Sequence, residues 1–176
     1  MNDTIGFRRA IFAAGCFWDV EAAFRRIPGV IATTAGYSGG MVENPSYEEV
    51  QEGNTMHAEA VEIAYDRAIV SYSQLLDAFW EMHDPTIHTD PQYRSAIFFP
   101  GSEEQELAQK SLTDQTGHGQ GNNPILTAIL SAGIFWIADE CTSSSMKKCV
   151  FIHQTPDLPL RKGKINGITC NPKGRF

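Results

Sequence analysis

The amino-acid sequence predicts an α/β fold of the α+β type: a two-layer sandwich in which helices cover a mixed sheet, followed by an irregular C-terminal arm. Apolar runs of strand length alternate along the chain with segments whose apolar residues recur at helical spacing. This alternation predicts the order β-α-β-α-β-α-β-α-β, which is typical of layered sandwiches. With 176 residues, of which 42% are hydrophobic, the chain is long enough to bury one core and fold alone.

The first half of the chain contains three expected strands and two expected helices. Pro28 and Gly29 end the first helix, because proline cannot continue it and glycine favours its end. Ser46 and Glu49 have the spacing of a capping box at the start of the second helix. We therefore expect strands at 9–14, 30–35 and 57–65, helices at 17–27 and between Ser46 and Gly53, and a loop at 36–40.

The second half repeats the alternation. Ser71 and Gln74 form a second capping box, and the apolar stripe that follows predicts a helix that ends near His83. A strand at 93–99 would place Tyr93 in phase with Ser95. The remaining expected elements are a polar surface helix at 102–112 and a last strand at 124–130.

Charge divides the chain into two parts. Residues 1–140 contain seven Lys and Arg against 20 Asp and Glu, whereas residues 141–176 contain seven against one. The second part also contains Cys141, Cys149 and Cys170 and several prolines and glycines. We therefore expect a catalytic α/β domain at 1–140 and, at 141–176, a basic, cysteine-containing arm of the same domain. Basic residues without interleaved aromatic residues do not predict nucleic-acid binding.

The sequence also bears on location and assembly. No apolar run approaches the roughly 20 residues that a membrane span needs, and the N-terminal residues lack the apolar region of a secretion signal. Four cysteines without such a signal indicate reduced thiols rather than a disulfide scaffold. We expect a cytoplasmic monomer that binds no membrane and no metal, because its cysteines and histidines have no metal-ligand spacing.

Cys16 is the candidate nucleophile, at the junction between the first strand and the first helix. A thiol at a helix N-terminus meets unpaired N–H groups and the positive end of the helix dipole, which favour the nucleophilic thiolate. Gly15 allows the backbone to turn there. A single cysteine after a strand is more commonly a small buried hydrophobic residue, so its neighbours decide between the two interpretations.

Glu59 is the candidate acid. The alternation at 57–65 places its carboxyl group on the same strand face as Val61 and Ile63, away from Glu62. Partial desolvation there would raise the carboxyl pKa toward values useful to a general acid. The alternative is a strand-end glutamate that reaches solvent.

Taken in order, the motifs of residues 9–140 resemble the A-type peptide methionine sulfoxide reductases. The motifs that carry this resemblance are Gly15-Cys16-Phe17-Trp18, Gly36-Tyr37-Ser38-Gly39-Gly40, Asn44-Pro45-Ser46-Tyr47, His57-Ala58-Glu59, His83-Asp84-Pro85-Thr86 and Gln92-Tyr93-Arg94-Ser95. The resemblance implies a ferredoxin-like mixed sheet and the reduction of methionine S-sulfoxide, free or in proteins.

This chemistry needs a nucleophile, an acid for the leaving oxygen, donors that hold the S–O dipole and an apolar cradle for the methyl group. The nucleophile and acid would be Cys16 and Glu59. The remaining positions that match the family are the donors Tyr47 and Tyr93 and the cradle residues Phe17 and Trp18. In the shortened loop before Gln92, Asp90 is the candidate to replace the family's loop aspartate in substrate binding.

Turnover would leave Cys16 as a sulfenic acid, which a second thiol condenses to a disulfide. We expect the resolving thiol to be Cys149 or, as a second choice, Cys170. No bound cofactor is expected, and an external dithiol, thioredoxin by resemblance or dithiothreitol, would reset the enzyme.

Three departures from the family pattern leave other functions open. The loop before Gln92 is short, the usual segment after Trp136 is replaced, and Met56 stands where glycine is common. A cysteine hydrolase or acyltransferase would pair Cys16 with His57 or His118 instead. A non-catalytic family member would use the altered tail to block the site or to bind a partner.

Overall fold

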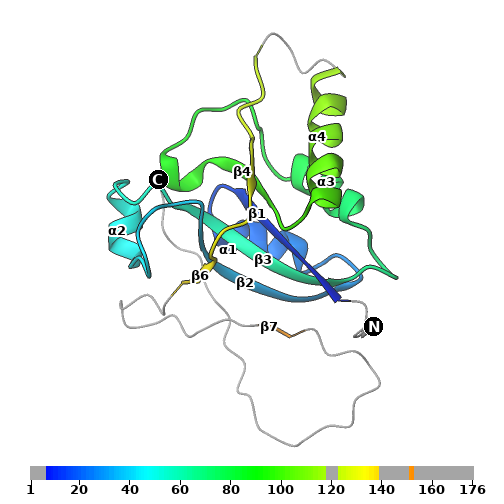
Figure 1. The fold of residues 1–176 in the computed structure, drawn as a ribbon, viewed down its shortest axis with the longest axis horizontal. Coiled ribbons are helices and arrows are strands. Elements are labelled where there is room, and N and C mark those ends of the chain that lie inside the picture. The colour runs from blue at the N-terminus through cyan, green and yellow to red at the C-terminus, as the bar shows by residue number, and fades with distance from the viewer. Residues whose placement is uncertain (1–6, 118–122, 139–150, 153–176) are drawn as a thin grey trace, which may run out of the picture.

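The computed structural model describes residues 7–117, 123–138 and 151–152. Within these ranges a mixed sheet has the strand order β5-β4-β1-β3-β2-β6, and β7 also pairs with β2. Only β4 and β5 run parallel, and the other pairs are antiparallel. The mixed sheet is therefore confirmed (Figure 1). The strands are β1 (Phe7–Ala14), β2 (Val30–Ser38), β3 (Ala58–Asp66), β4 (Ser95–Phe99), β5 (Ala128–Ser131), β6 (Trp136–Ile137) and β7 (Phe151–Ile152).

Four α-helices and one 3-10 turn connect the strands in the described ranges. They are α1 (Phe17–Phe24), α2 (Tyr47–Gln51), α3 (Tyr72–Glu81), the turn η1 (Pro91–Tyr93) and α4 (Ser102–Gly117). Both predicted capping boxes are present, with Ser46 and Ser71 each accepting a hydrogen bond from the backbone N–H three residues later. No helix in the described part of the chain is both long and apolar enough to cross a membrane.

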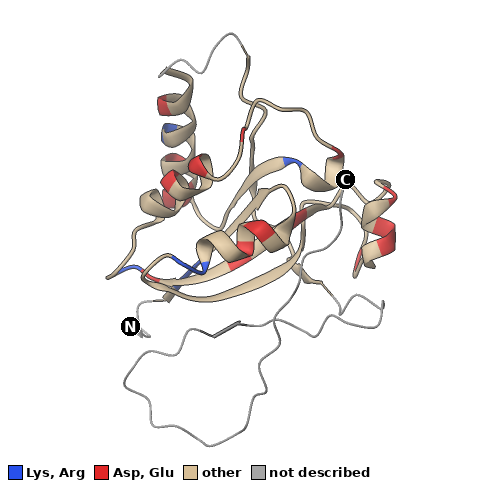
Figure 2. Cartoon of the chain, turned by 180° about the vertical axis from the view of Figure 1, so that it is seen from behind, with Lys and Arg blue, Asp and Glu red and all other residues tan. Residues whose placement is uncertain are grey.

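The main core lies between the sheet and the helices. Phe12 of β1 stacks on Phe24 of α1, Phe79 and Tyr72 of α3, with ring centroids 5.2, 5.3 and 5.9 Å away. Helices α1 and α3 therefore cover the same face of the sheet. This arrangement places α1 behind the sheet in Figure 1 and in front of it in Figure 2.

The opposite face of the sheet carries a smaller core, built largely of alanines around Ile11 and Phe98, against which Phe135 packs. Strands β5 and β6 lie at opposite ends of the strand order, so the chain between them crosses this face. Small side chains suit this face because, among the described residues, a single extended segment rather than a helix covers it.

Several predicted boundaries were wrong for identifiable reasons. Strand β2 continues through the expected loop to Ser38, and Gly36 is tolerated there because the Trp136 backbone approaches so closely that a Cβ would collide with it. Helix α1 ends at Phe24 in a turn that leads to Gly29, which has a φ of 94°. The last strand begins at Ala128 instead of 124.

Tyr93 was also predicted wrongly, because it ends η1 and β4 begins only at Ser95. Pro91 begins this 3-10 turn, where its fixed φ and missing N–H are tolerated. The late start of β5 has a similar local cause, since the Leu126 N–H donates to the Pro85 carbonyl at 2.8 Å rather than to a strand.

Candidate active site

Cys16 occupies the N-cap position of α1. Gly15, in the left-handed region with a φ of 97°, turns the chain out of β1. The Cys16 carbonyl then accepts hydrogen bonds from the N–H groups of Asp19 (3.1 Å) and Val20 (3.3 Å). The sequence therefore places the thiol at a strand-to-helix junction, as predicted, where it is partly exposed.

The expectation that the helix end makes Cys16 a thiolate was wrong for the resting protein. Burial raises the thiol pKa above its usual 9.0, and the negative charges of Glu59 and Asp19 raise it further. Backbone N–H groups of Trp18 and Asp19 lower the pKa, as the helix argument predicts, but they are outweighed. At neutral pH the resting group is therefore the thiol.

Glu59 lies directly beside this thiol. Its carboxylate accepts a hydrogen bond of 3.1 Å from the backbone N–H of Phe17, the residue that follows Cys16. The residue is only 3% exposed, and burial raises its pKa to about 7, although the Phe17 N–H opposes the shift. The predicted burial and raised pKa of Glu59 are confirmed, and the group is half protonated near neutral pH.

Two aromatic side chains follow the nucleophile. Phe17 is buried and contacts Trp18 edge to face, with ring centroids 5.0 Å apart, whereas Trp18 is 40% exposed. Phe17 also lies against Tyr37 of β2, at 6.0 Å between centroids. Trp18 thus offers an accessible apolar surface beside the thiol. Tyr37 was missed because its glycine-rich surroundings favoured a loop.

The two predicted tyrosine donors come from separate elements. Tyr47 begins α2, is partly buried and accepts a hydrogen bond from the Gln51 side chain at 2.9 Å. Tyr93, also partly buried, ends η1, and its N–H donates to the carbonyl of the exposed Asp90 at 2.9 Å. The buried Gln92 joins these elements, because its side-chain amide donates to the carbonyls of Val50 and Gln51 at 3.0 and 3.1 Å.

His57 is a buried scaffold residue that fixes the loop after β2. The Gly40 N–H donates to Nδ1 at 3.1 Å, and Nε2–H donates to the Val42 carbonyl at 2.8 Å. Both ring nitrogens are therefore used, and His57 has no nitrogen left to accept the Cys16 proton. This geometry argues against the hydrolase arrangement that pairs the two residues.

Arg94 was not singled out from the sequence as a site residue, although it follows Tyr93. Its guanidinium donates to the Pro91 carbonyl at 2.9 Å and to the Gly39 carbonyl at 3.4 Å. Gly39 has a φ of 77°, and a Cβ there would press on both Arg94 and Phe98. Through these two hydrogen bonds, Arg94 links the η1 turn, which contains Tyr93, to the loop after β2.

His83 closes a second network near the start of β4. Its Nδ1–H donates to the Phe79 carbonyl at 2.9 Å, and Nε2 accepts from the Ser95 hydroxyl at 2.8 Å. Ser95 also contacts the Thr127 hydroxyl at 2.7 Å and pairs with Ala14, two residues before the nucleophile. Burial lowers the pKa of His83, so it stays neutral and structural at neutral pH.

Some predicted residues lie outside the described part of the chain, namely Cys149, Cys170 and His118. Within the described residues, no three histidine, cysteine or acidic side chains gather as metal ligands would. The structure thus brings Cys16, Glu59 and the aromatic pair together, with Tyr47 and Tyr93 on elements joined by Gln92.

Comparison with known proteins assigns the family. The family model described as peptide methionine sulfoxide reductase matches residues 8–153. The chain belongs to the peptide methionine sulfoxide reductase family. It is 47% identical over 156 residues to the peptide methionine sulfoxide reductase MsrA of Geobacter metallireducens, covering 84% of this chain and 95% of that one.

Solved structures agree on the fold of this reductase. Reduced Mxr1 from Saccharomyces cerevisiae superposes with a TM-score of 0.72 at 26% identity, covering 80% of this chain and 84% of that one. Mxr1 in complex with Trx2 superposes with a TM-score of 0.60 at 20% identity, covering 88% and 95%. The predicted fold class is confirmed.

The comparisons also confirm the predicted function. The reductase is an oxidoreductase that reduces methionine S-sulfoxide to methionine. They favour neither a hydrolase nor a non-catalytic protein.

Proposed function

We propose that in this reductase Cys16 attacks the sulfur of methionine S-sulfoxide while Glu59 protonates the leaving oxygen. The observation that carries this assignment is the 3.1 Å hydrogen bond from the Phe17 N–H to the Glu59 carboxylate. It ties a buried acid with a pKa of about 7 to the residue that follows the nucleophile. An acid with this pKa gives and takes protons readily at neutral pH.

Proton balance explains how a resting thiol becomes the nucleophile. Moving the thiol proton to the ionised Glu59 yields a thiolate beside a protonated acid, with no change in net charge. The thiolate bonds to the substrate sulfur while the sulfoxide oxygen takes the Glu59 proton. The resulting hydroxyl group then moves to the Cys16 sulfur as its bond to the substrate sulfur breaks, so Cys16 becomes a sulfenic acid and methionine is released. The proton that Glu59 took from the thiol thus ends on the sulfenic acid hydroxyl, and Glu59 returns to its ionised form.

Surrounding residues bind the substrate in this proposal. Tyr47 and Tyr93 donate hydrogen bonds to the sulfoxide oxygen, and Trp18 with Phe17 encloses the terminal methyl group. Asp90 is exposed at the start of η1, where it contacts the rest of the substrate. Pockets for small ligands are usually lined by apolar side chains with a few well-placed hydrogen-bond donors, as in this arrangement.

The oxidised enzyme must be reduced by an external dithiol before the next turnover, and we propose that thioredoxin is this reductant. The Mxr1 structure with Trx2 supports the assignment, because that relative forms such a complex. A second cysteine, Cys149 or Cys170 in the arm at 141–176, condenses with the sulfenic acid, releases water and leaves a disulfide for the dithiol to reduce. We further propose that the protein is a cytoplasmic monomer and binds no cofactor.

Epimer-resolved turnover tests the proposal. With dithiothreitol as reductant, the protein should reduce the S-epimer of methionine sulfoxide in a peptide and in the free amino acid, and Cys16→Ser should abolish both reactions. A matched Cys141→Ser variant should keep its activity. Turnover that survives Cys16→Ser, or ester hydrolysis that needs no dithiol, would contradict the assignment.

A further inference from the structure

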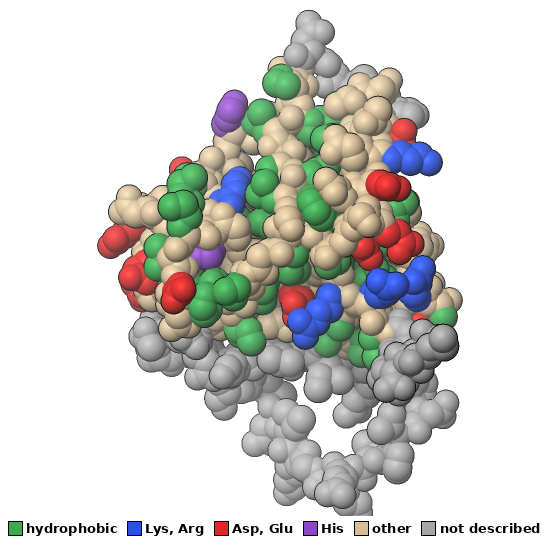
Figure 3. Space-filling model, in the orientation of Figure 1, with side chains coloured by type: hydrophobic (Ala, Val, Ile, Leu, Met, Phe, Trp, Pro, Cys, Tyr) green, Lys and Arg blue, Asp and Glu red, His purple; other side chains and the backbone are tan. Residues whose placement is uncertain are grey.

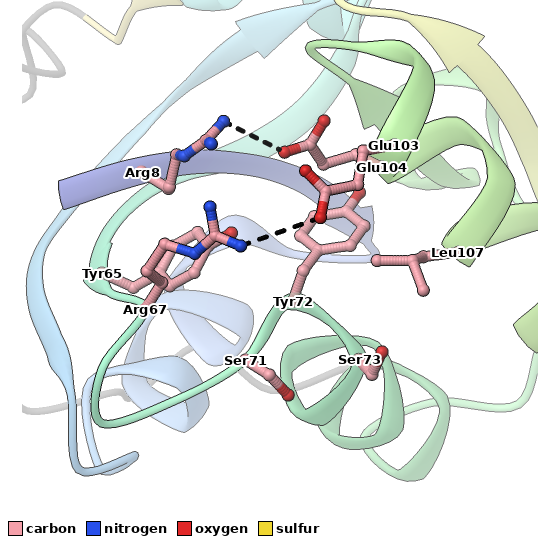
Figure 4. A pocket seen from close by; sticks show the side chains of 9 residues that line it. All are labelled: Arg8, Tyr65, Arg67, Ser71, Tyr72, Ser73, Glu103, Glu104 and Leu107. Atoms are coloured by element: carbon pink, nitrogen blue, oxygen red, sulfur yellow. Dashed lines mark ion pairs between the residues drawn. The ribbon is translucent and has the colours of Figure 1, made fainter. Parts of the chain in front are cut away.

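A pocket of about 130 Å³ lies at the opposite end of the sheet from the active site (Figure 4). Arg8 at the start of β1 and Arg67 just after β3 line one side, and Glu103 and Glu104 in the first turn of α4 line the other. Arg8 and Ala14 are six residues apart along β1, and Cys16 lies beyond Ala14. At the rise of an extended strand these two positions are about 20 Å apart, so the pocket is no part of the catalytic site.

The charged side chains of this pocket face each other without close contact. Arg8 lies 3.7 Å from Glu104, and Arg67 lies 3.7 Å from Glu103, distances too long for hydrogen bonds. Among the described residues neither guanidinium donates a hydrogen bond. Both arginines therefore keep donors for a further partner, and such loose ion pairs contribute little to stability.

Tyr72 provides a second, independent observation. It is only 5% exposed, and its hydroxyl has no hydrogen-bond partner among the described residues. A buried hydroxyl without a partner destabilises the fold, and phenylalanine would fill the same space without that penalty. In Figure 4 the Tyr72 ring lies at the inner side of the pocket, beneath Glu104. A ligand that separates Glu104 from Arg8 would give this hydroxyl its missing partner.

We propose that the pocket binds a small zwitterion of the α-amino acid class. Its carboxylate would contact Arg8 and Arg67, its ammonium group would contact Glu103 and Glu104, and the Tyr72 hydroxyl would donate to the carboxylate. Two cations face two anions here, and Figure 3 shows the mixed charges at this edge of the molecule near α4. The acidic side chains on α2 form a different surface.

The charge arrangement selects for a ligand that carries both signs. A simple anion would meet two carboxylates, and a simple cation would meet two guanidiniums, so each would be repelled from one side. A zwitterion replaces both long ion pairs by charge-assisted hydrogen bonds, which are the stronger kind. A cavity of about 150 Å³ holds benzene, so this slightly smaller one has room for glycine or alanine.

A titration of the full chain followed by amide NMR tests the site, with glycine as the probe and acetate and methylammonium as single-charge controls. We expect saturable shifts around Arg67, Tyr72 and Glu103, with a Kd on the order of 1 mM because the ligand is small. Acetate and methylammonium should bind at least about tenfold more weakly.

Variants sharpen the test. Arg67→Gln and Glu103→Gln should each weaken glycine binding by about tenfold, and Tyr72→Phe should weaken it by about threefold. Arg9→Gln is the matched control, because Arg9 pairs with Glu62 at 3.4 Å outside the pocket. Methionine sulfoxide turnover should be unchanged in all four variants, which shows that they fold.

Three results would overturn the proposal. Acetate that binds as tightly as glycine would make the pocket an anion site. Amide chemical-shift changes that never saturate with glycine would show only general charge effects. So would a loss of glycine affinity in Arg9→Gln equal to that in the pocket variants. Tyr72→Phe that raises the urea midpoint without changing glycine affinity would show that the hydroxyl serves no ligand.

Discussion

Tyr37 and Glu59 stand directly opposite each other in the antiparallel ladder of β2 and β3. Phe17 joins the two, because its ring lies 6.0 Å from the Tyr37 ring and its N–H donates to the Glu59 carboxylate at 3.1 Å. The residue after the nucleophile is thus held by two central strands. The separation of thiol and acid is therefore set by the sheet, which is more rigid than a loop.

Replacement of Glu59 by glutamine should lower kcat/KM about 100-fold, because the leaving oxygen loses its proton donor. The wild-type pair is reactive when Cys16 and Glu59 share one proton, so kcat/KM should rise with pH through about 7 and fall above the raised pKa of Cys16. In Glu59→Gln the limb near pH 7 should disappear. A limb that persists in this variant would remove Glu59 from the proposed role.

The same carboxyl group should make stability depend on pH. Glu59 binds its proton more tightly in the folded state, with a pKa of about 7 against 4.5 when unfolded. Its contribution to stability is therefore full below pH 4.5 and is lost as pH rises through 7, a change on the order of 3 kcal/mol.

Urea unfolding at several pH values, compared between wild type and Glu59→Gln, isolates this contribution. As pH rises, the unfolding free energy of Glu59→Gln should increase relative to that of the wild type. Glutamine still accepts the Phe17 hydrogen bond but carries no buried charge. Glu62→Gln on the opposite face of β3 is the matched control and should show little change. Parallel pH curves for wild type and Glu59→Gln would contradict the raised pKa.

Much of this site follows from local sequence patterns. Alternation along β3 is enough to predict that Glu59 faces the core, and the Gly15 turn before an amphipathic segment predicts where Cys16 lies. The protonation state of Cys16 was not predictable, since it depends on burial and on Glu59 from a distant strand. The same holds for Tyr37, whose strand conformation depends on pairing with β6.

Met56 should be a source of backbone strain beside the active site. Its φ of 60° lies in the left-handed region, which costs a side-chain-bearing residue about 1 kcal/mol, and the side chain is 56% exposed. Met56→Gly should therefore stabilise the protein by up to about 1 kcal/mol in urea unfolding. Met41→Gly, at a neighbouring position that is 86% exposed and has no positive φ, should not stabilise it. Equal effects of the two changes would show that strain at Met56 is absent.

Arg94 should act on catalysis by holding the Tyr93 turn in place. Lysine has a single ammonium group and cannot reach both the Pro91 and Gly39 carbonyls with the same fork geometry. Arg94→Lys should therefore lower kcat/KM by roughly 10-fold to 100-fold, since small displacements of binding groups are costly. Arg26→Lys, in the exposed turn after α1, should change neither rate nor stability. A fall in stability without a change in kcat/KM would assign Arg94 a purely structural role.

The resolving cysteine can be predicted from the position of β7. Phe151 pairs with Thr33 of β2, four residues from Tyr37, which lies against Phe17. Cys149 precedes Phe151 by two residues, so chain connectivity limits the separation of their Cα atoms to about 7 Å. Cys170 lies 18 residues beyond Ile152 and would need a long loop to return.

We therefore expect a single turnover without reductant to produce a disulfide from Cys16 to Cys149 in preference to Cys170. Peptide mapping of substrate-oxidised protein should find this bond, and Cys149→Ser should leave Cys16 as a sulfenic acid that dimedone labels. Cys141→Ser is the matched control and should still form the bond. If Cys16 is recovered only as sulfenic acid in the wild type, with Cys141, Cys149 and Cys170 all reduced, the enzyme works with one cysteine and an external thiol must attack the sulfenic acid directly.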